Sequence, residues 1–234
     1  MPNAIITGAT HGIGKAIAEK LLANGFSIAI CARTVADLEN CQREWQKQYP
    51  GAAIIAENAD LSDKLQVQKF ASSVLTAFTE LDILVNNAGL FMTGSLIDEP
   101  DGQLEEMMNV NVYGAYHLTR AVVPHIKRNG QGHIFNISSV AGLKPYANSG
   151  SYSITKYAMQ GFSDNLRLEL LDTGIRVTSI CPGFTNSRSW EGSGVDAGRL
   201  SKPEDIAEMI WASYLLSENT NVETIVMRPA KGDL

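Results

Sequence analysis

Short apolar runs of strand length recur along the chain and alternate with longer segments of helical periodicity. The runs are NAIIT (3–7), SIAIC (27–31), AAIIA (52–56), DILVN (82–86), HIFNI (133–137), IRVTSI (175–180) and ETIVM (223–227). They are apolar on both faces, which is typical of parallel strands covered by helices on each side. The alternation predicts a Rossmann-type, doubly wound α/β fold with a parallel sheet of about seven strands.

This pattern fills residues 1–234 and leaves no room for a second domain, so a single domain is expected. Turn and capping residues mark several helix boundaries: Gly25 after the first helix, Pro50-Gly51 after the second, Gly174 after the fifth, and Ser201 before Lys202-Pro203 at the last. The one long irregular stretch is 183–202, which indicates a lid or binding loop, with a plain connector as the alternative.

Charge and composition narrow the classes of partner. The net charge is -6 and no basic stripe is present, which argues against nucleic acid and anionic membrane and favours a small-molecule substrate. The apolar run at the N-terminus is too short for a secretory or membrane-spanning segment, so we expect a cytoplasmic protein. Cys31, Cys41 and Cys181 form no C-x-x-C pair and are expected to be buried, reduced thiols.

A glycine loop, TGATHGIG, follows the first apolar run directly and precedes the helical segment KAIAEKLLA. Gly8, Gly12 and Gly14 permit a tight turn and a close approach of the backbone to a pyrophosphate, which would meet the N-terminal amides of the helix. The strand before and the helix after favour a dinucleotide-binding loop over an ordinary strand-to-helix turn.

The end of the second strand indicates which dinucleotide binds. It reads CAR, with Ala32 and Arg33 where NAD sites usually carry a carboxylate for the ribose hydroxyl. A guanidinium can hold the 2′-phosphate of NADP(H) by paired charge-assisted hydrogen bonds, and His11 and Lys15 would add positive potential. NADP(H) is therefore favoured over NAD(H), with a solvated surface charge as the alternative for Arg33.

Tyr152 and Lys156 lie four positions apart in a segment of helical period, so both can point at one reacting centre. An ammonium nearby favours the phenolate and is expected to lower the pKa of the tyrosine, which makes its hydroxyl usable for proton transfer. Ser138 and Ser139 end the fifth strand, at the edge where ligands bind in open α/β sheets. A serine hydroxyl there can polarise a carbonyl oxygen.

In order and spacing, these motifs resemble the short-chain dehydrogenase/reductase family, and the resemblance spans nearly the whole chain. The matching segments are TGATHGIG, Asp60 in NADLS, NNAG at 86–89, Asn111 in NVNVYG, Ser139 in ISSVAG, Tyr152 and Lys156 in YSITK, and Pro182-Gly183.

The resemblance implies a role for each catalytic residue. Tyr152 would be the general acid/base, Lys156 would lower its pKa and hold the nicotinamide ribose, and Ser139 would orient the carbonyl. Ser139 is preferred to Ser138 because it lies thirteen positions before Tyr152, as in the family. Asn111 would anchor a water that feeds protons through Lys156.

The resemblance also implies the contacts with the cofactor. Besides Arg33, Tyr152 and Lys156, they are Gly8, Thr10, His11, Gly12, Ile13, Gly14, Asp60, Leu61, Asn87, Ala88, Gly89, Pro182, Gly183, Thr185 and Ser187. Asp60 and Leu61 would meet the adenine and Thr185 the carboxamide. Ser187 stands where the family commonly has threonine and can make the same hydrogen bond.

The chain also departs from the family at its end, VETIVMRPAKGDL, which lacks the glycine pair of many family reductases. The resemblance implies a homodimer or homotetramer, with dimerisation through the helices that hold Asn111 and Tyr152.

Within the family, the stretch CARTVADLE, the loop around Trp190 and the ending VMRPAKGDL resemble bacterial sepiapterin reductases and broad-range carbonyl reductases. By position, the substrate pocket would contain Phe91, Met92, Tyr146, Phe184 and Trp190, which suits a flat ring or an acyl chain. For Trp190 the alternative is a lid residue that packs on the protein itself.

An NADP(H)-dependent carbonyl reductase is the function expected from these features. Two alternatives stay open: a 3-oxoacyl or hydroxy-acid dehydrogenase, and a reductase-like fold that only binds NADP(H) as a sensor. No metal is expected, because His11, His117, His125 and His133 show no ligand spacing.

Overall fold

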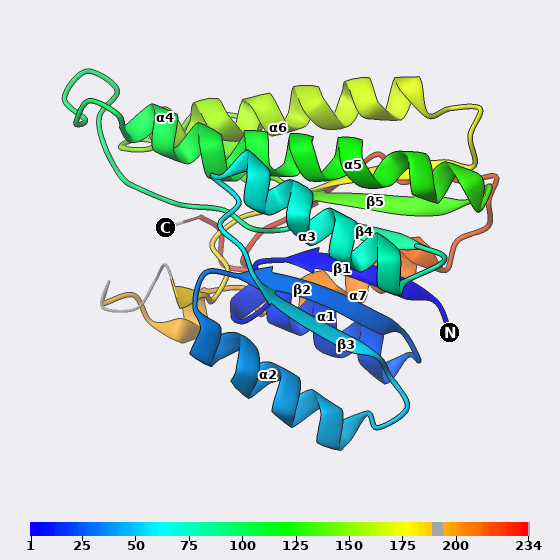
Figure 1. The fold of residues 1–234 in the computed structure, drawn as a ribbon. Helices are drawn as coiled ribbons and strands as arrows, with labels where there is room; N and C mark the ends of the chain where they lie inside the picture. Colours follow the sequence, from blue (N-terminus) through cyan, green and yellow to red (C-terminus); the bar gives the residue numbers. More distant parts are fainter. Residues whose placement is uncertain (189–193, 234) are drawn as a thin grey trace.

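A parallel sheet of seven strands organises the computed structural model, which describes residues 1–188 and 194–233 (Figure 1). The strand order is β3-β2-β1-β4-β5-β6-β7. The strands are β1 (Asn3–Thr7), β2 (Ser27–Ala32), β3 (Ile54–Asn58), β4 (Ile83–Asn86), β5 (Gly132–Ile137), β6 (Ile175–Pro182) and β7 (Thr224–Met227). Each of the seven predicted runs overlaps one of these strands, so the Rossmann-type prediction is confirmed.

Helices cover both faces of the sheet, as Figure 1 shows. One face carries α1 (Gly12–Ala23), α2 (Val35–Gln48) and α7 (Pro203–Tyr214), and the other carries α3 (Lys64–Ala77), α5 (Gly114–Arg128) and α6 (Gly150–Glu169). A short helix, α4 (Gln103–Met108), continues into α5 through a π-helical segment, Asn109–Tyr113. All the described residues belong to this one layered unit.

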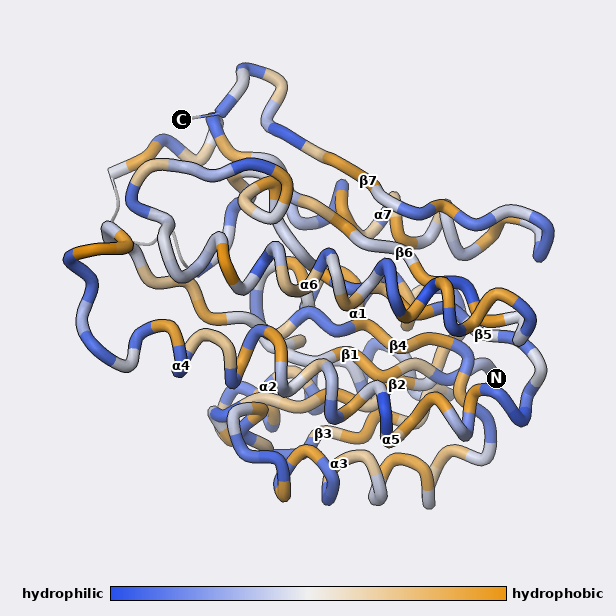
Figure 2. The backbone as a smooth tube through the Cα atoms, turned by 90° about the horizontal axis from the view of Figure 1, so that it is seen from above, coloured by the Kyte–Doolittle hydropathy of each residue, from blue (hydrophilic) through white to orange (hydrophobic). Residues whose placement is uncertain are grey.

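Each face of the sheet has its own apolar core. Ile6 and Ile28 of the strands pack with Leu21 of α1 and Ile210 of α7 on one side. On the other side, residues of α3 and α5 such as Phe70 and Leu118 pack against β4 and β5. Burying one such side chain contributes about 1.5–3 kcal/mol. Figure 2 shows hydrophobic segments running along the central strands, and Cys31, Cys41 and Cys181 are buried among the apolar elements, as predicted.

Local sequence signals explain several helix ends. The side chain of Asp63 caps α3 by accepting hydrogen bonds from the backbone amides of Leu65 and Gln66. Pro203 occupies the first turn of α7, where its missing N–H costs no hydrogen bond. Gly25 and Gly174 adopt φ values of +83° and +72°, a region that glycine reaches without steric cost, so these predicted boundaries are confirmed.

The topology also sets the place of the site. The chain first builds outward from β1 through β2 to β3, then returns to add β4 on the opposite side of β1. In open α/β sheets, ligands bind beyond the carboxyl ends of the strands at such a switch point. The loops after β1 and β4 are therefore the walls of the expected cofactor site. Among the described residues, no helix is long and apolar enough to cross a membrane.

Candidate active site

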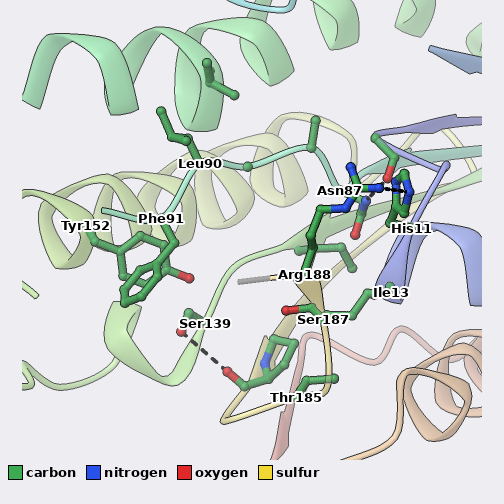
Figure 3. A pocket seen from close by; sticks show the side chains of 18 of the residues that line it. His11, Ile13, Asn87, Leu90, Phe91, Ser139, Tyr152, Thr185, Ser187 and Arg188 are labelled. Atoms are coloured by element: carbon green, nitrogen blue, oxygen red, sulfur yellow. Dashed lines mark hydrogen bonds between the residues drawn. The ribbon is translucent and has the colours of Figure 1, made fainter. Parts of the chain in front are cut away.

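A cavity of about 700 Å³ opens at the carboxyl edge of the sheet, a size that suits a cofactor and a small substrate (Figure 3). Nearly all the predicted site residues line it: Gly8, Thr10, His11, Gly12, Ile13, Gly14, Arg33, Asp60, Leu61, Asn87, Ala88, Gly89, Phe91, Ser139, Tyr146, Tyr152, Lys156, Pro182, Gly183, Phe184, Thr185 and Ser187. Asn111 lies just behind the wall, and Trp190 lies outside the described residues.

The glycine loop has the geometry of a phosphate cradle. Gly8 and Gly12 adopt φ values of +64° and +52°, where other residues are strained. A Cβ on Gly14 would lie 2.4 Å from both the Asn87 Nδ2 and the Gly8 carbonyl oxygen, so only glycine fits there. The loop leads directly into α1, whose N-terminal amides favour an anion.

Hydrogen bonds join the glycine loop to the end of β4. Thr7 Oγ1 accepts hydrogen bonds from the amides of Asn87 (2.9 Å) and Ala88 (3.0 Å). In return, Asn87 Nδ2 donates to the carbonyl oxygens of Thr7 (2.8 Å) and Gly8 (3.0 Å). These hydrogen bonds join the loop after β1 to the loop after β4, so the two loops form one continuous wall of the cavity.

The end of the cavity beside β2, where the adenosine of a dinucleotide is expected, carries several charged groups. Arg33 is exposed and lines the cavity, as do Asp37 in the first turn of α2 and Arg188 beyond β6. Sequence analysis did not identify Asp37 or Arg188. The two residues lie far apart in the sequence. The segment after β6 folds over the glycine loop, which brings Arg188 to the cavity wall that also carries Asp37.

At the opposite end lie Ser139 and Tyr152. Ser139 begins the short 3-10 turn Val140–Gly142; its Oγ accepts from the Ala141 amide (3.1 Å) and donates to the Pro182 carbonyl oxygen (3.4 Å). Tyr152 comes from the first turn of α6, and the Phe91 ring packs edge-on against its ring, with the centroids 4.8 Å apart. Ser138 also lines the cavity, and its hydroxyl donates to the Lys156 carbonyl oxygen (3.1 Å).

Burial raises the pKa of the Tyr152 phenol, and a hydrogen bond with Ser139 acts in the opposite direction. Lys156 Nζ donates to the Ile137 carbonyl oxygen (3.0 Å) and lies 5.6 Å from the centroid of the tyrosine ring. The lowering of the tyrosine's pKa by Lys156 stays a prediction. Burial also lowers the pKa of Lys156 to about 8, with the nearby Cys181 acting in the opposite direction.

Asn111 sits inside the π-helical segment between α4 and α5. Its side chain accepts from the Leu90 amide (2.6 Å) and donates to the Leu90 carbonyl oxygen (2.9 Å) and to Thr155 Oγ1 (3.0 Å). It thereby connects the loop after β4 to α6 behind Lys156. π-Helical turns are rare and frequently mark functional sites.

The N-terminus of α6, which carries Tyr152, is capped by a carboxylate from another part of the chain. Glu99 accepts hydrogen bonds from the amide of Ser151 (3.3 Å) and from its hydroxyl, and Gln103 donates to the same carboxylate (3.0 Å). Backbone hydrogen bonds join Gly94 to Asn148 and Gly150 to Gly94. A negative charge at this position also complements the helix dipole.

The predicted substrate residues form an aromatic wall. Tyr146 and Phe184 pack edge-on with their centroids 6.4 Å apart, and Phe91 covers Tyr152. Tyr146 donates to Asp233 Oδ2 (2.7 Å) and accepts from Arg228 (2.7 Å), which ties the end of the chain to this wall. Met92 is half-buried but is not among the residues that line the cavity. Within the described part of the chain, no group of three His, Cys, Asp or Glu side chains could hold a metal ion.

Comparisons with known proteins show which proteins the chain is similar to. Residues 2–196 match the family model for short chain dehydrogenases. The chain is 33% identical to a sepiapterin reductase of Chlorobaculum tepidum, over 98% of this chain and 97% of that protein. It is 32% identical to an NADP-dependent 3-hydroxy acid dehydrogenase of Salmonella typhi, over 96% and 94% of the two chains. An alcohol dehydrogenase of Thermococcus sibiricus, solved in complex with 5-hydroxy-NADP, superposes with a TM-score of 0.91 at 29% identity, over 98% and 97% of the chains.

Proposed function

The chain belongs to the short-chain dehydrogenase family, and from that premise we propose that it is an NADP(H)-dependent carbonyl reductase. The observation that carries the proposal is the distribution of groups in one cavity. Ser139, Tyr152 and Lys156 line one end, and the glycine cradle and Arg33 line the other. Such a cavity can hold a dinucleotide along its length with the reacting carbon beside the tyrosine hydroxyl.

The protein groups divide the proton chemistry between them. A bound nicotinamide supplies or accepts the hydride. Ser139 Oγ, at the cavity wall, would donate a hydrogen bond to the carbonyl oxygen and polarise it. The Tyr152 hydroxyl would give its proton to the same oxygen as the alcohol forms, and Lys156 would hold the ribose and return a proton toward the tyrosine.

Two features of the chain support NADP(H). Arg33 follows β2 at the adenosine end of the cavity, where a 2′-phosphate would stand, and Ala32 beside it carries no charge that would repel a phosphate. The Thermococcus sibiricus neighbour was solved with an NADP derivative, and a metagenomic short-chain oxidoreductase at 30% identity was solved with NADP.

The substrate class in this proposal is sepiapterin, a related pteridine or an aromatic ketone. Phe91, Tyr146 and Phe184 offer ring faces and edges against which a flat ring can pack. The sepiapterin reductase among the relatives supports the same class. Trp190, the remaining aromatic candidate, lies outside the described residues.

A hydroxy acid or 3-oxoacyl substrate is the second candidate, and one observation favours it. Lys144 and Arg228 flank Tyr146 beside the cavity, where a substrate carboxylate could reach them. Asp233 pairs with Arg228 and lies 3.8 Å from Lys144 Nζ, so an acidic substrate would compete with this carboxylate. The 3-hydroxy acid dehydrogenase among the relatives supports this candidate.

The test is the consumption of NADPH and of NADH, followed by nicotinamide absorbance. The substrates are sepiapterin, an acetoacetyl thioester, and aromatic ketones and diketones, with Tyr152→Phe as the control. A preference for sepiapterin with NADPH supports the pteridine class, and a preference for the thioester supports the second candidate. Binding of NADPH without turnover of any carbonyl or alcohol would favour the non-catalytic sensor and contradict the proposal.

We also propose a cytoplasmic homo-oligomer. Tyr113, Tyr116, Tyr157, Leu168 and Leu171, on or beside α5 and α6, are exposed apolar residues, and a second copy could cover them. Sedimentation equilibrium distinguishes a dimer or tetramer from a monomer, and a monomer at micromolar concentration would contradict this part.

A further inference from the structure

Three side chains from separate parts of the chain meet at the adenosine end of the cavity. Asp37 Oδ2 lies 3.5 Å from Arg188 Nη1 and 3.6 Å from His11 Nε2. Arg188 also hydrogen-bonds to His11, toward which it points in Figure 3. All three line the cavity. Because a guanidinium can only donate, His11 Nε2 accepts from Arg188, so the carboxylate holds Arg188 directly and His11 through Arg188.

The segment that carries Arg188 lies against the phosphate cradle. The Ser187 Cβ is 3.3 Å from where a Cβ on Gly12 would be, so residues 187–188 cover the glycine loop. From there Arg188 reaches toward Asp37, four residues after Arg33 in the sequence. Arg188, His11 and Arg33 therefore line the same cavity, although they come from three separate segments of the chain.

A carboxylate at this place conflicts with an NADP(H) site unless it has a separate role. A phosphate monoester carries a charge of about -1.5 to -2 at neutral pH, so Asp37 would repel it. The phosphate also offers three acceptor oxygens, more than the carboxylate can present to the same donors. Asp37 would thus lose the competition for Arg188 once a 2′-phosphate enters.

We propose that Asp37 is a stand-in for the 2′-phosphate of NADP(H): it holds Arg188 in place until the phosphate displaces it. This proposal rests on the proposed function, because it assumes that NADP(H) occupies the cavity. Arg188 is then a second guanidinium for the phosphate, beside Arg33.

The opposite role for Asp37 is recognition of NAD(H). Carboxylates near this end of the second strand can accept a hydrogen bond from the ribose 2′-hydroxyl. In that case Asp37 would favour binding of NAD(H), and its removal would lower the affinity for that cofactor. The two roles therefore predict opposite changes in the affinity for NADH.

The experiment measures the dissociation constants of NADPH and NADH for the full chain by titration calorimetry. Asp37→Asn removes the charge and keeps the shape, and Arg188→Gln removes the guanidinium. The matched controls are Glu39→Gln and Arg43→Gln, which make the same charge changes on exposed positions of α2. Thermal unfolding checks that each variant folds.

Asp37→Asn should lower the dissociation constant of NADPH about five-fold, and Arg188→Gln should raise it about ten-fold. The dissociation constant of NADH should change less than two-fold in both variants. Neither control variant should move either constant by more than two-fold. Weaker NADH binding in Asp37→Asn would assign the carboxylate to the ribose and overturn the proposal.

Equal losses of affinity for NADPH and NADH in Arg188→Gln would place Arg188 on the pyrophosphate and also overturn the proposal. Dissociation constants that stay unchanged in both variants would overturn it as well. Failure of the proposed function has a different signature: the unsubstituted chain would bind neither cofactor, or would prefer NADH.

Discussion

Lys156 Nζ lies 5.6 Å from the centroid of the Tyr152 ring, one helical turn away on α6, and donates its hydrogen bond to the Ile137 carbonyl oxygen. The ammonium is thus held by the end of β5 in the free protein. A Cβ on Gly89 would come within 3.6 Å of Nζ and 3.5 Å of Asn111 Oδ1. Gly89 thus lies beside both the ammonium of Lys156 and the amide of Asn111, at ordinary van der Waals distance.

Tyr152→Phe should lower kcat by about two to four orders of magnitude, because it removes the proton donor and leaves the ring in place. The dissociation constant of NADPH should change less than three-fold. Steady-state kinetics and calorimetric titration measure the two quantities. Residual turnover above a tenth of the original rate would remove Tyr152 from the acid/base role.

Lys156→Met should change the pH dependence of stability. The pKa of Lys156 is lowered from 10.5 to about 8, so the unfolded chain binds a proton more readily. Burying the protonated lysine lowers the free energy of unfolding of the original chain. This loss is fully present below pH 8 and disappears as the pH rises to 10.5. The stability of the variant relative to the original chain should therefore fall by about 3 kcal/mol between these values.

Urea unfolding at pH 7.5, 9 and 10.5 tests the lysine prediction. The control is Lys144→Met, which makes the same change of side chain at an exposed lysine. A stability difference between Lys156→Met and the original chain that stays constant with pH would show that burial does not shift this lysine.

Arg33→Ala should weaken NADPH by about ten- to a hundred-fold and NADH by less than two-fold, because only NADPH carries the phosphate that the guanidinium would hold. Binding of both cofactors by fluorescence titration measures this ratio. Equal losses for the two cofactors would mean that Arg33 supports the wall rather than the phosphate.

Glu99→Ala should lower both stability and kcat, because the carboxylate caps the helix that positions Tyr152. Loss of a helix cap costs about 0.5–2 kcal/mol. Glu99→Gln keeps an acceptor oxygen and should recover more than half of both losses. Asp98→Ala, at the exposed neighbouring position, is the control, and similar kinetics for Asp98→Ala and Glu99→Ala would contradict the positioning role.

The sequence predicted the sheet well because parallel strands buried on both faces must be apolar throughout. The largest offset was at β3, where the predicted run 52–56 starts two residues before Ile54–Asn58. Ala52 and Ala53 continue the apolar pattern, but the pairing with β2 begins at Ile54 opposite Ile28. Hydrophobicity alone does not report where a neighbouring strand begins.

The site was predictable where a sequence motif reflects a need of the backbone. At Gly14, for example, any side chain would clash with the amide of Asn87. Asp37, Arg188 and Glu99 were not predictable. Each contacts partners at least 26 residues away in the chain or across the cavity, and their local sequence resembles ordinary charged surface. Charged residues of this kind acquire their roles only from the fold.

The π-helical segment Asn109–Tyr113 changes the helical phase between α4 and α5, which together form the helical stretch 103–128. A π turn holds one more residue than an α turn closed by the usual hydrogen bond, which rotates everything after it by about 100°. The face of α4 that meets α6 and the face of α5 that meets α3 are therefore out of phase. Chimeras with related reductases should inherit this stretch whole, because a crossover that loses one residue would turn Leu118 out of its core.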